Sequence, residues 1–262
     1  MEQAWNDARP QAPPQPRINR IGVSDVTESL RLGWADFKNA PTQIVFLCLI
    51  YPIVGFVLGS AAAGGELLPL VYPLLAGFAL LGPLAALGIY ELSRRQEQGL
   101  PVSWTNMFGV LRSPAIFSIA ALAVGLVLIF LLWLTVARGL FHLIMGPDLP
   151  ADFGAMVSQV LGTSRGMTLI LLGNLVGAGF ALAVLAMSVV SFPMLLDRDV
   201  TPAEAVRTSL AAFRANPVTL ILWGIIVAMT LAVGMALLFV GLAVALPVLG
   251  HATWHLYRRL VT

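Results

Sequence analysis

Charged side chains are scarce in this sequence. Asp, Glu, Lys and Arg together make up 11% of the 262 residues, whereas a soluble domain carries about 25%. Hydrophobic residues account for 58% of the chain, so polar groups cannot cover a water-facing surface. This composition excludes a soluble globular protein and predicts an integral membrane protein with no nucleic-acid partner.

Cysteine and recognisable catalytic motifs are lacking as well. The single cysteine, Cys48, lies inside an apolar run, which excludes a disulfide framework and a cysteine metal site. The sequence has no His-Glu-x-x-His pair and no phosphate-binding glycine loop. The ionisable residues that mark an ion path are missing from the middle of its apolar runs. We therefore expect neither an enzyme nor a cofactor, and an ion-coupled carrier is disfavoured.

Six apolar segments are long enough to cross a bilayer, which takes a helix of about 20 residues. The last two belong to one run from 217 to 257, which as a single helix would be about 60 Å long, twice the hydrocarbon thickness. That run must fold back near Gly234 to Gly241. We predict an all-α, polytopic bundle of six transmembrane helices. They cover residues 44–63, 67–92, 115–136, 167–196, 218–236 and 238–257.

The beginning of the chain differs in character from the rest. Residues 1–22 are mostly polar and include the proline-rich stretch PQAPPQP, which disfavours a helix and offers too little apolar surface to fold. We expect a disordered cytoplasmic tail at 1–22, followed by a membrane domain at 23–262. Because the tail lacks the apolar core of a signal peptide, the first span should act as an uncleaved insertion signal.

A sequence unit recurs along the chain. Residues 25–41 align without a gap with residues 201–217, which pairs their acidic, arginine and proline positions. The stretch 83–95 that ends the first hairpin likewise aligns with 247–259. A fainter copy, SWTNMFGVLRSP at 103–114, precedes the middle hairpin. We predict units at 25–95, 101–198 and 199–262, each an interfacial amphipathic helix followed by a transmembrane hairpin.

The entry helix of the first unit is predicted at 25–38. Asp25 can cap its start with Glu28 at the third helical position, the capping-box pattern. The helix is too short and too charged to span, so we expect it to lie flat on the membrane with Trp34 at headgroup depth. Its apolar stripe is Val26, Leu30, Trp34 and Phe37.

Aromatic and basic side chains near the ends of the spans predict contacts with membrane lipids. Aromatic rings favour the interface, and each basic residue near an anionic leaflet contributes about 1 kcal/mol. The expected interface anchors are Trp34, Phe37, Phe213, Trp254 and Tyr257. The expected headgroup contacts are Arg31, Lys38, Arg207, Arg214, Arg258 and Arg259.

The basic residues gather on alternate connections. Of the 15 Lys and Arg residues, only Arg138 and Arg165 fall on the opposite side. By the positive-inside rule, both termini and the entry helices lie in the cytoplasm, so we expect a multi-pass membrane protein with a cytoplasmic start. The one sizeable exterior segment is then 139–166, with a short interfacial helix at 152–161.

Three polar side chains near or within the spans are candidate contacts. His251 and His255 lie one helical turn apart, and such a pair can share a metal or haem. The sequence shows no carboxylate or cysteine partner for them, and an interfacial belt with Trp254 and Tyr257 explains them better, so no metal is expected. Asn174, the clearest deep polar residue, is either a solute contact or a hydrogen bond to a neighbouring helix.

The segment PMLLDRDVTPAEAVRTSLAAFRANPVTLILW and the later stretch LPVLGHATWHLYRRL resemble an uncharacterised bacterial family. That family consists of predicted six-helix integral membrane proteins and is known as a domain of unknown function. The resemblance covers nearly the whole chain after the tail. It implies the fold and the membrane location, and it carries over no catalytic residues.

Two functional interpretations remain open. The first is a non-enzymatic interaction, accessory or assembly factor for a larger membrane complex, such as a respiratory one. Apolar spans without buried charge favour it, as do the Gly-x-x-x-Gly patterns at 55–59 and 173–177, which let helices approach closely.

The second interpretation is a transporter, channel or lipid-handling protein for a small or lipidic solute. It predicts a cavity lined by residues such as Asn174, Ser188, Ser191 and Thr135, whereas a solid apolar interior would exclude it. The missing coupling residues favour the first interpretation.

Overall fold

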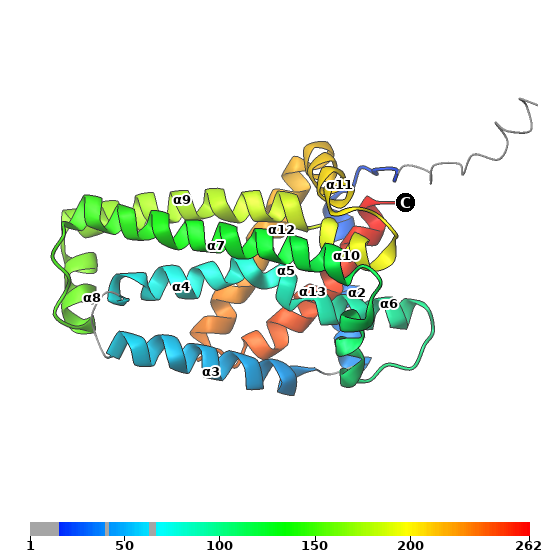
Figure 1. Ribbon diagram of the computed structural model, residues 1–262, viewed down its shortest axis with the longest axis horizontal. Coiled ribbons are helices and arrows are strands. Elements are labelled where there is room, and N and C mark those ends of the chain that lie inside the picture. Colours follow the sequence, from blue (N-terminus) through cyan, green and yellow to red (C-terminus); the bar gives the residue numbers. More distant parts are fainter. Residues whose placement is uncertain (1–15, 40–41, 63–66) are drawn as a thin grey trace, which may run out of the picture.

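The computed structural model describes residues 16–39, 42–62 and 67–262. Within these ranges the chain is helical apart from turns and one isolated β-bridge, so the predicted all-α class is confirmed. Three long helices lie along the long axis of the molecule (Figure 1), namely α3 (Gln43–Ala62), α7 (Ile116–Met145) and α9 (Ser164–Ser188). Two others, α12 (Pro217–Ala236) and α13 (Leu242–Leu260), run obliquely across them.

Four helical segments of the described chain are long and apolar enough to cross a membrane. The other two predicted spans, α3 and α13, are helical but do not meet the same test, and α3 contributes only a shorter apolar stretch, Cys48–Val57. The histidines and arginines in its last turns make α13 less apolar. The structure therefore supports a multi-pass helical protein, and the number six stays a prediction. The four segments are Leu68–Glu97, Ile116–Met145, Ser164–Asp197 and Pro217–Ala236.

The segment Leu68–Glu97 is a chain of short helical pieces. Its prolines lack the N–H that continues an α-helix, which breaks the stretch into α and 3-10 turns. Gly77 provides a close approach to α7, because a Cβ there would lie 2.6 Å from the Trp133 ring. The Trp133 Nε1–H donates to the Pro73 carbonyl at 2.9 Å. The pieces are η1 (Leu68–Leu70), α4 (Val71–Gly77), η2 (Phe78–Leu81), α5 (Gly82–Ala85) and α6 (Leu87–Glu97).

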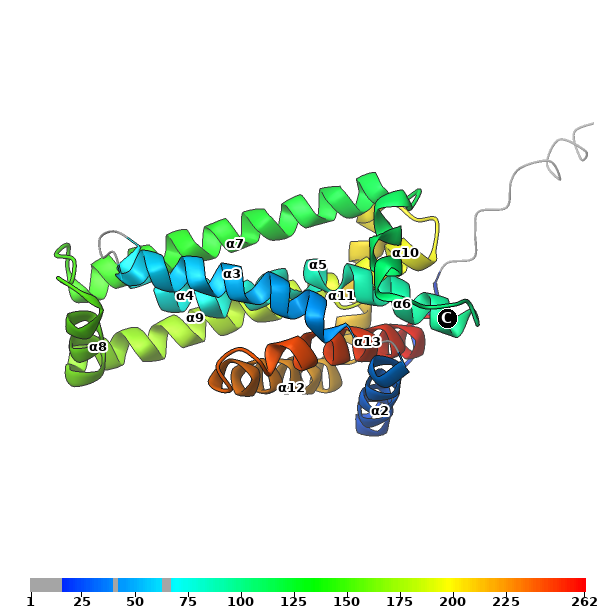
Figure 2. The ribbon, with the colours of Figure 1, turned by 90° about the horizontal axis from the view of Figure 1, so that it is seen from below.

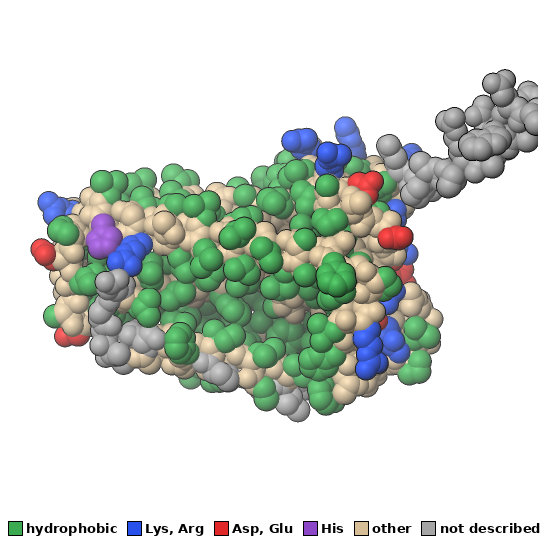
Figure 3. Space-filling model, in the orientation of Figure 1, with side chains coloured by type: hydrophobic (Ala, Val, Ile, Leu, Met, Phe, Trp, Pro, Cys, Tyr) green, Lys and Arg blue, Asp and Glu red, His purple; other side chains and the backbone are tan. Residues whose placement is uncertain are grey.

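The two ends of the bundle differ (Figures 1 and 2). One end, which we call the arginine-rich end, gathers α2 (Val23–Asn39), α6, η3 (Trp104–Arg112), α10 (Ser191–Asp197), α11 (Pro202–Ala215) and the C-terminus. The opposite end carries α8 (Phe153–Gly162), whose position agrees with the predicted helix at 152–161. Figure 3 shows a mainly hydrophobic flank, with charged side chains gathered towards the two ends.

The entry segments of the predicted units each pack on the exit helix of another unit. Helix α2 lies across α13, where a Cβ on Gly33 would be only 2.5 Å from the Ala252 nitrogen. Segment η3 packs on α6, where Gly88 faces Met107 at a comparable distance. Helix α11 packs on α9 and α10, and Ser209 Oγ donates to a backbone carbonyl of α9 at 2.8 Å. The entry segment of unit 1 therefore packs on unit 3, the entry segment of unit 2 packs on unit 1, and the entry segment of unit 3 packs on unit 2.

Helix α2 begins earlier than the sequence predicted. It starts at Val23, and Asp25 accepts a hydrogen bond from the Gly22 N–H at 2.9 Å. Asp25 therefore occupies the third helical position, and its predicted role as the N-cap was wrong. Glu28, which was expected to complete the capping box, instead pairs with Arg31 at 2.6 Å.

The buried face of α2 also differs from the predicted stripe. Val26 and Phe37, which were expected to face the membrane, are buried within the protein, whereas Trp34 is 47% exposed. Small residues, and not Trp34, face α13, because the two helix backbones approach closely at Gly33. The buried residues of α2 are Val26, Ser29, Gly33 and Phe37.

Part of the predicted disordered tail is held in the structure. Residues 1–15 lie outside the described ranges, but Arg17 exchanges backbone hydrogen bonds with Thr262 in both directions, at 3.0 and 3.1 Å. A further backbone bond joins Asn19 N–H to the Leu260 carbonyl at 2.9 Å. The membrane domain therefore includes the chain from residue 16, and both ends of the described chain meet at the arginine-rich end.

Candidate functional site

An apolar cavity of about 420 Å³ lies inside the bundle. This volume falls within the range of about 300–1,000 Å³ that is usual for small-molecule sites. Four helical segments and Phe46 line it. The segments are 79–90, which runs from η2 to α6, 178–189 of α9 and its link to α10, 221–231 of α12, and 246–253 of α13.

Small residues make room for this cavity. The interrupted stretch around α5 contributes Gly82, Pro83 and neighbouring alanines, where a regular helix with larger side chains would fill the space. On α12, Gly224 lets Leu185 of α9 approach to 2.8 Å from where a Cβ would lie. The interior is therefore not solid, so the finding that would have excluded solute or lipid handling is not observed.

The cavity reaches the lipid-facing side of the bundle between α9 and α12. Several lining residues on these two helices are exposed, with Leu182 at 40%, Ile221 at 38% and Ile225 at 54%. These residues belong to segments that qualify as membrane spans. The opening is thus positioned to admit a molecule from the bilayer.

Three hydroxyl-bearing residues, Tyr90, Ser188 and Thr253, and the indole of Trp223 interrupt the apolar lining. No charged side chain among the described residues lines the cavity. Ser188 Oγ donates to the Val184 carbonyl at 2.6 Å, and Thr253 Oγ1 donates to the Leu249 carbonyl at 2.7 Å.

Most of the predicted cavity residues lie elsewhere. Ser188 does line the cavity, but Ser191 is buried outside it, and Thr135 is exposed on α7. Asn174 is exposed too, and it joins two spans by accepting a hydrogen bond from Tyr72 at 2.7 Å. The second explanation given for Asn174, a bond to a neighbouring helix, is the one that the structure shows.

The two histidines lie on the face of α13 that points away from the cavity. His255 Nε2 lies 2.8 Å from Asp36 Oδ2 of α2, and His251 Nδ1 lies 2.6 Å from Ser93 Oγ of α6. The same Asp36 oxygen is 3.8 Å from His251 Nδ1. The expectation that the pair has no carboxylate partner was therefore wrong, because Asp36, which is 219 residues from His255 in sequence, folds against it.

This cluster holds helices together and lacks the geometry of a catalytic or metal site. In a serine triad the hydroxyl and the carboxylate bind opposite imidazole nitrogens, whereas Ser93 and Asp36 both face Nδ1 of His251. His251 Nε2 is buried without a partner. Among the described residues, no group of three or more His, Cys, Asp or Glu could hold a metal ion. The cluster links α2, α6 and α13.

Two of the predicted membrane anchors are instead core residues. Trp254 and Tyr257 are both 0% exposed, because their polar atoms reach carboxylates on neighbouring helices. Trp254 Nε1 donates to Glu97 at 3.1 Å, and Tyr257 donates to Asp197 at 2.6 Å. Among the other predicted anchors, Phe37 is buried and Phe213 is half-buried, which leaves Trp34 as the exposed one.

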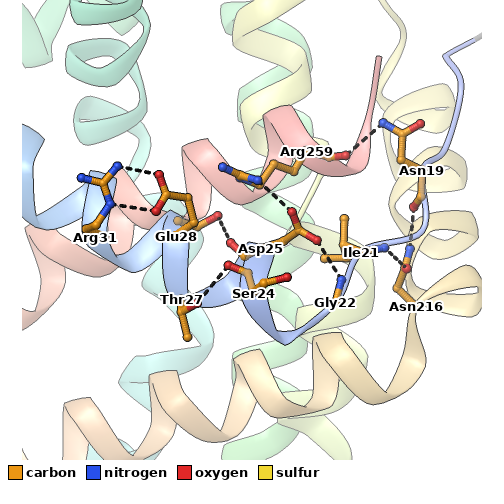
Figure 4. A network of polar contacts seen from close by, with 11 residues as sticks. Asn19, Ile21, Gly22, Ser24, Asp25, Thr27, Glu28, Arg31, Asn216 and Arg259 are labelled. Atoms are coloured by element: carbon orange, nitrogen blue, oxygen red, sulfur yellow. Dashed lines mark hydrogen bonds and ion pairs between the residues drawn. The ribbon is translucent and has the colours of Figure 1, made fainter.

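The predicted headgroup contacts divide into paired and exposed residues. Arg258 is shared between Glu97 at 2.9 Å and Asp197 at 3.0 Å, while Arg259 pairs with Asp25 at 2.7 Å. The backbone N–H of Gly22, together with Arg259, holds the pKa of Asp25 below its usual value. Figure 4 shows the contacts of Asp25 with Gly22 and Arg259, beside Asn19 and Asn216. Lys38, Arg207 and Arg214 are exposed at the arginine-rich end.

An exposed apolar face on η3 was absent from the predicted anchors. Trp104, Phe108 and Leu111 are 54%, 55% and 68% exposed, and the two aromatic rings contact each other edge to face. Their spacing of four and three residues in SWTNMFGVLRSP was the signal that could have identified them.

These features define a multi-pass α-helical membrane protein with an internal apolar cavity. Residues 71–197 match a protein family described as "Predicted integral membrane protein (DUF2189)". The resemblance to an uncharacterised family of membrane proteins is confirmed, over α4 to α10. The segments in which the resemblance was noted, 193–223 and 246–260, lie almost entirely outside that match. No curated protein and no solved structure matches the chain.

Proposed function

We propose that this protein binds a small hydrophobic or lipidic molecule within a six-span bundle in the bacterial inner membrane. The cavity of about 420 Å³ carries the proposal. A folded interior is normally packed to a density that leaves few voids larger than a water molecule. A space of this size with an opening between two spans is therefore best explained by an occupant that comes from the bilayer.

The proposed topology adds α3 and α13 to the four qualifying segments. The chain folds back between α12 and α13, in the region that the sequence predicted, through Leu238 and Phe239, which have positive φ angles of 53° and 65°. This turn lets α13 return to the arginine-rich end, where its last residue pairs with the start of the described chain. The proposed repeat of three units agrees with the order in which the entry segments pack on exit helices.

The orientation follows from the distribution of basic residues. Arg138 and Arg165 lie towards the end that carries α8, and the other Lys and Arg residues of the described chain belong to segments at the arginine-rich end. The positive-inside rule therefore favours a cytoplasmic arginine-rich end, with both termini in the cytoplasm. Anionic lipids are proposed to contact Lys38, Arg207 and Arg214 there.

The proposed role is binding or passive handling of the molecule, without catalysis and without ion coupling. Among the residues that the structure describes, no charged side chain lines the cavity, so the described lining lacks the groups on which proton- or sodium-driven transport depends. The histidine cluster lies on the face of α13 away from the cavity, and its side chains bind Asp36 of α2 and Ser93 of α6.

The second candidate is an accessory or assembly factor for a larger membrane complex, such as a respiratory one. A Cβ added at Gly55 or Gly59 of α3 would meet nothing within 4 Å, so this face is open to a helix of another protein. In contrast, Gly177 packs against Trp133 within the bundle. The open face favours a protein partner, but lipid can cover it equally well.

Mass spectrometry of the gently solubilised protein tests the first proposal. We expect the wild-type protein, isolated directly or after incubation with membrane lipid extract, to carry a hydrophobic molecule. Ala228→Phe, which fills the cavity from α12, should abolish this binding. Ala120→Phe places the same ring on an exposed position of α7 outside the cavity and should leave it intact.

Two outcomes would contradict the proposal. One is a wild-type protein that binds no such molecule under either condition, and the other is equal loading of the two variants. A protein that co-purifies with the wild type and is lost in Gly55→Leu would instead support the assembly role.

A further inference from the structure

We infer that the cavity is selective for an uncharged, single-chain lipid whose polar end is a hydrogen-bond donor, such as a long-chain alcohol. This inference rests on the proposed function and specifies the chemistry of the molecule that the cavity takes. It follows from where the hydroxyl groups lie, how their protons are used and which charges are missing.

The three hydroxyl-bearing residues lie at the same end of their lining segments. Along α6 and α9 the lining runs towards the arginine-rich end and finishes near Tyr90 and Ser188, and along α13 it finishes at Thr253. Residues at the start of the same lining segments, such as Ala79, Ala178 and Leu246, are purely apolar and lie farther from the arginine-rich end along the chain direction. The cavity therefore has a polar end towards the membrane surface and an apolar end towards the membrane interior. A lipid has the same polarity within one leaflet.

Two of the three hydroxyl protons are committed to the protein. Ser188 and Thr253 donate to carbonyls one turn earlier on their own helices. A hydroxyl group has one proton to donate and two lone pairs that can accept. The polar end of the cavity thus offers acceptors, and it matches a ligand that brings its own proton.

Charged lipids fit this site poorly. No Lys, Arg or His of the described ranges lines the cavity, and His251 of α13 faces Ser93 on the other side of that helix. An ionised carboxylate or phosphate would lose its hydration without gaining a partner, which is costly in an apolar environment. Fatty acids and phospholipid headgroups are therefore disfavoured.

Competition between matched lipids tests this selectivity. Nile red, an uncharged dye whose emission rises in apolar surroundings, is bound to the full-length protein in detergent and then displaced. The competitors share a 14-carbon chain and differ only at the polar end: 1-tetradecanol, methyl myristate and myristate at neutral pH. One additional hydrogen bond contributes about 1 kcal/mol net, so the alcohol should displace the dye at roughly fivefold lower concentration than the ester, and myristate should be the weakest.

Substitutions that remove the acceptors should remove this preference. In Ser188→Ala combined with Thr253→Val, which removes both hydroxyl groups whose protons are committed, we expect the alcohol and the ester to compete equally, while the affinity for Nile red is retained. Thr135→Val removes a hydroxyl from the exposed face of α7 outside the cavity and should leave the preference unchanged. A thermal unfolding curve for each variant verifies that it is folded.

The outcomes separate the inference from the proposed function. If Nile red binds but the wild-type protein does not prefer the alcohol, or if the double variant keeps the preference, the inference is wrong and the cavity can still be a general apolar site. If Nile red and all three lipids fail to bind the wild-type protein, the proposed function fails and the inference fails with it.

Discussion

Asn216, in the link between α11 and α12, binds the backbone of Ile21, which lies 195 residues earlier in the chain. Its Oδ1 accepts a hydrogen bond from the Ile21 N–H at 2.8 Å, and its Nδ2 donates to the Asn19 carbonyl at 2.9 Å. Asn216 is 5% exposed. One amide side chain therefore fixes the segment that leads into α2 against the third predicted unit (Figure 4).

Replacing Asn216 by Leu should lower the stability of the protein measurably. The substitution removes a donor and an acceptor from partly buried backbone groups, and an unsatisfied buried group costs about 1–3 kcal/mol. Thermal unfolding in detergent should show a lower Tm for Asn216→Leu. Asn39→Leu, at the exposed end of α2, is the matched control and should change Tm little. Equal Tm values for the two variants would show that the Asn216 bonds contribute nothing.

The crossing of α2 and α13 gives a second prediction. Gly33→Ala would place a Cβ 2.5 Å from the Ala252 nitrogen and 2.8 Å from its Cα, and a rigid backbone cannot yield as a flexible side chain can. We expect α2 to separate from α13, which limited proteolysis within α2 would detect as faster cleavage. Gly179→Ala on α9 meets open space and should behave as the wild type. Unchanged cleavage in Gly33→Ala would contradict the close packing.

The contact between Asp36 and His255 predicts an energetic coupling. A hydrogen bond involving a charged group contributes about 1.5–3 kcal/mol, and these two side chains are 15% and 20% exposed, so screening by solvent should be limited. A double-mutant cycle with Asp36→Ala and His255→Ala, read from unfolding free energies, should give a coupling of about 1 kcal/mol or more. Asp199→Ala, at an exposed aspartate, combined with His255→Ala should show none. Additive effects of the first pair would mean that the contact is not formed.

Asp25 predicts a dependence of stability on pH. The Gly22 N–H and Arg259 lower its pKa from the ordinary value of 3.8, so folding favours the ionised carboxylate. The resulting stabilisation is complete above the unfolded pKa and is lost as the pH falls through the lower, folded pKa. The wild type should therefore exceed Asp25→Asn in Tm at pH 6, by an amount that shrinks towards pH 3. The effect should be small because the pair is partly exposed. A difference that stays constant or grows on acidification would reverse the assigned sign.

The sequence was sufficient to locate the helices. Apolar runs predicted the positions of the spans, because length and composition decide whether a segment can cross a bilayer. The fold-back after α12 and the helix at Phe153–Gly162 were likewise predictable from local signals. The extent of α7 was underestimated, since it continues to Met145, past the point at which Arg138 suggested an end.

The sequence could not show which faces of these helices meet. Trp254 is typical of an interface anchor, but Glu97, 157 residues away, binds its indole nitrogen inside the fold. His251 and His255 gained a carboxylate partner in the same way, from a helix at the other end of the chain. The cavity was predictable only as an alternative, because whether small residues on α5, α9 and α12 leave a void depends on how closely those helices pack.

Labelling of single cysteines in intact cells tests the membrane architecture most directly. Cys48→Ser provides a background without cysteine, in which single cysteines are introduced and treated with a reagent that cannot cross the inner membrane. The account predicts labelling at Asp148→Cys and Leu238→Cys, and protection until the membrane is permeabilised at Glu28→Cys, Asp199→Cys and Thr262→Cys. If α13 does not cross, positions 238 and 262 will react alike, and labelling of position 28 from outside would reverse the orientation. Either result would contradict the six-span bundle with a cytoplasmic arginine-rich end.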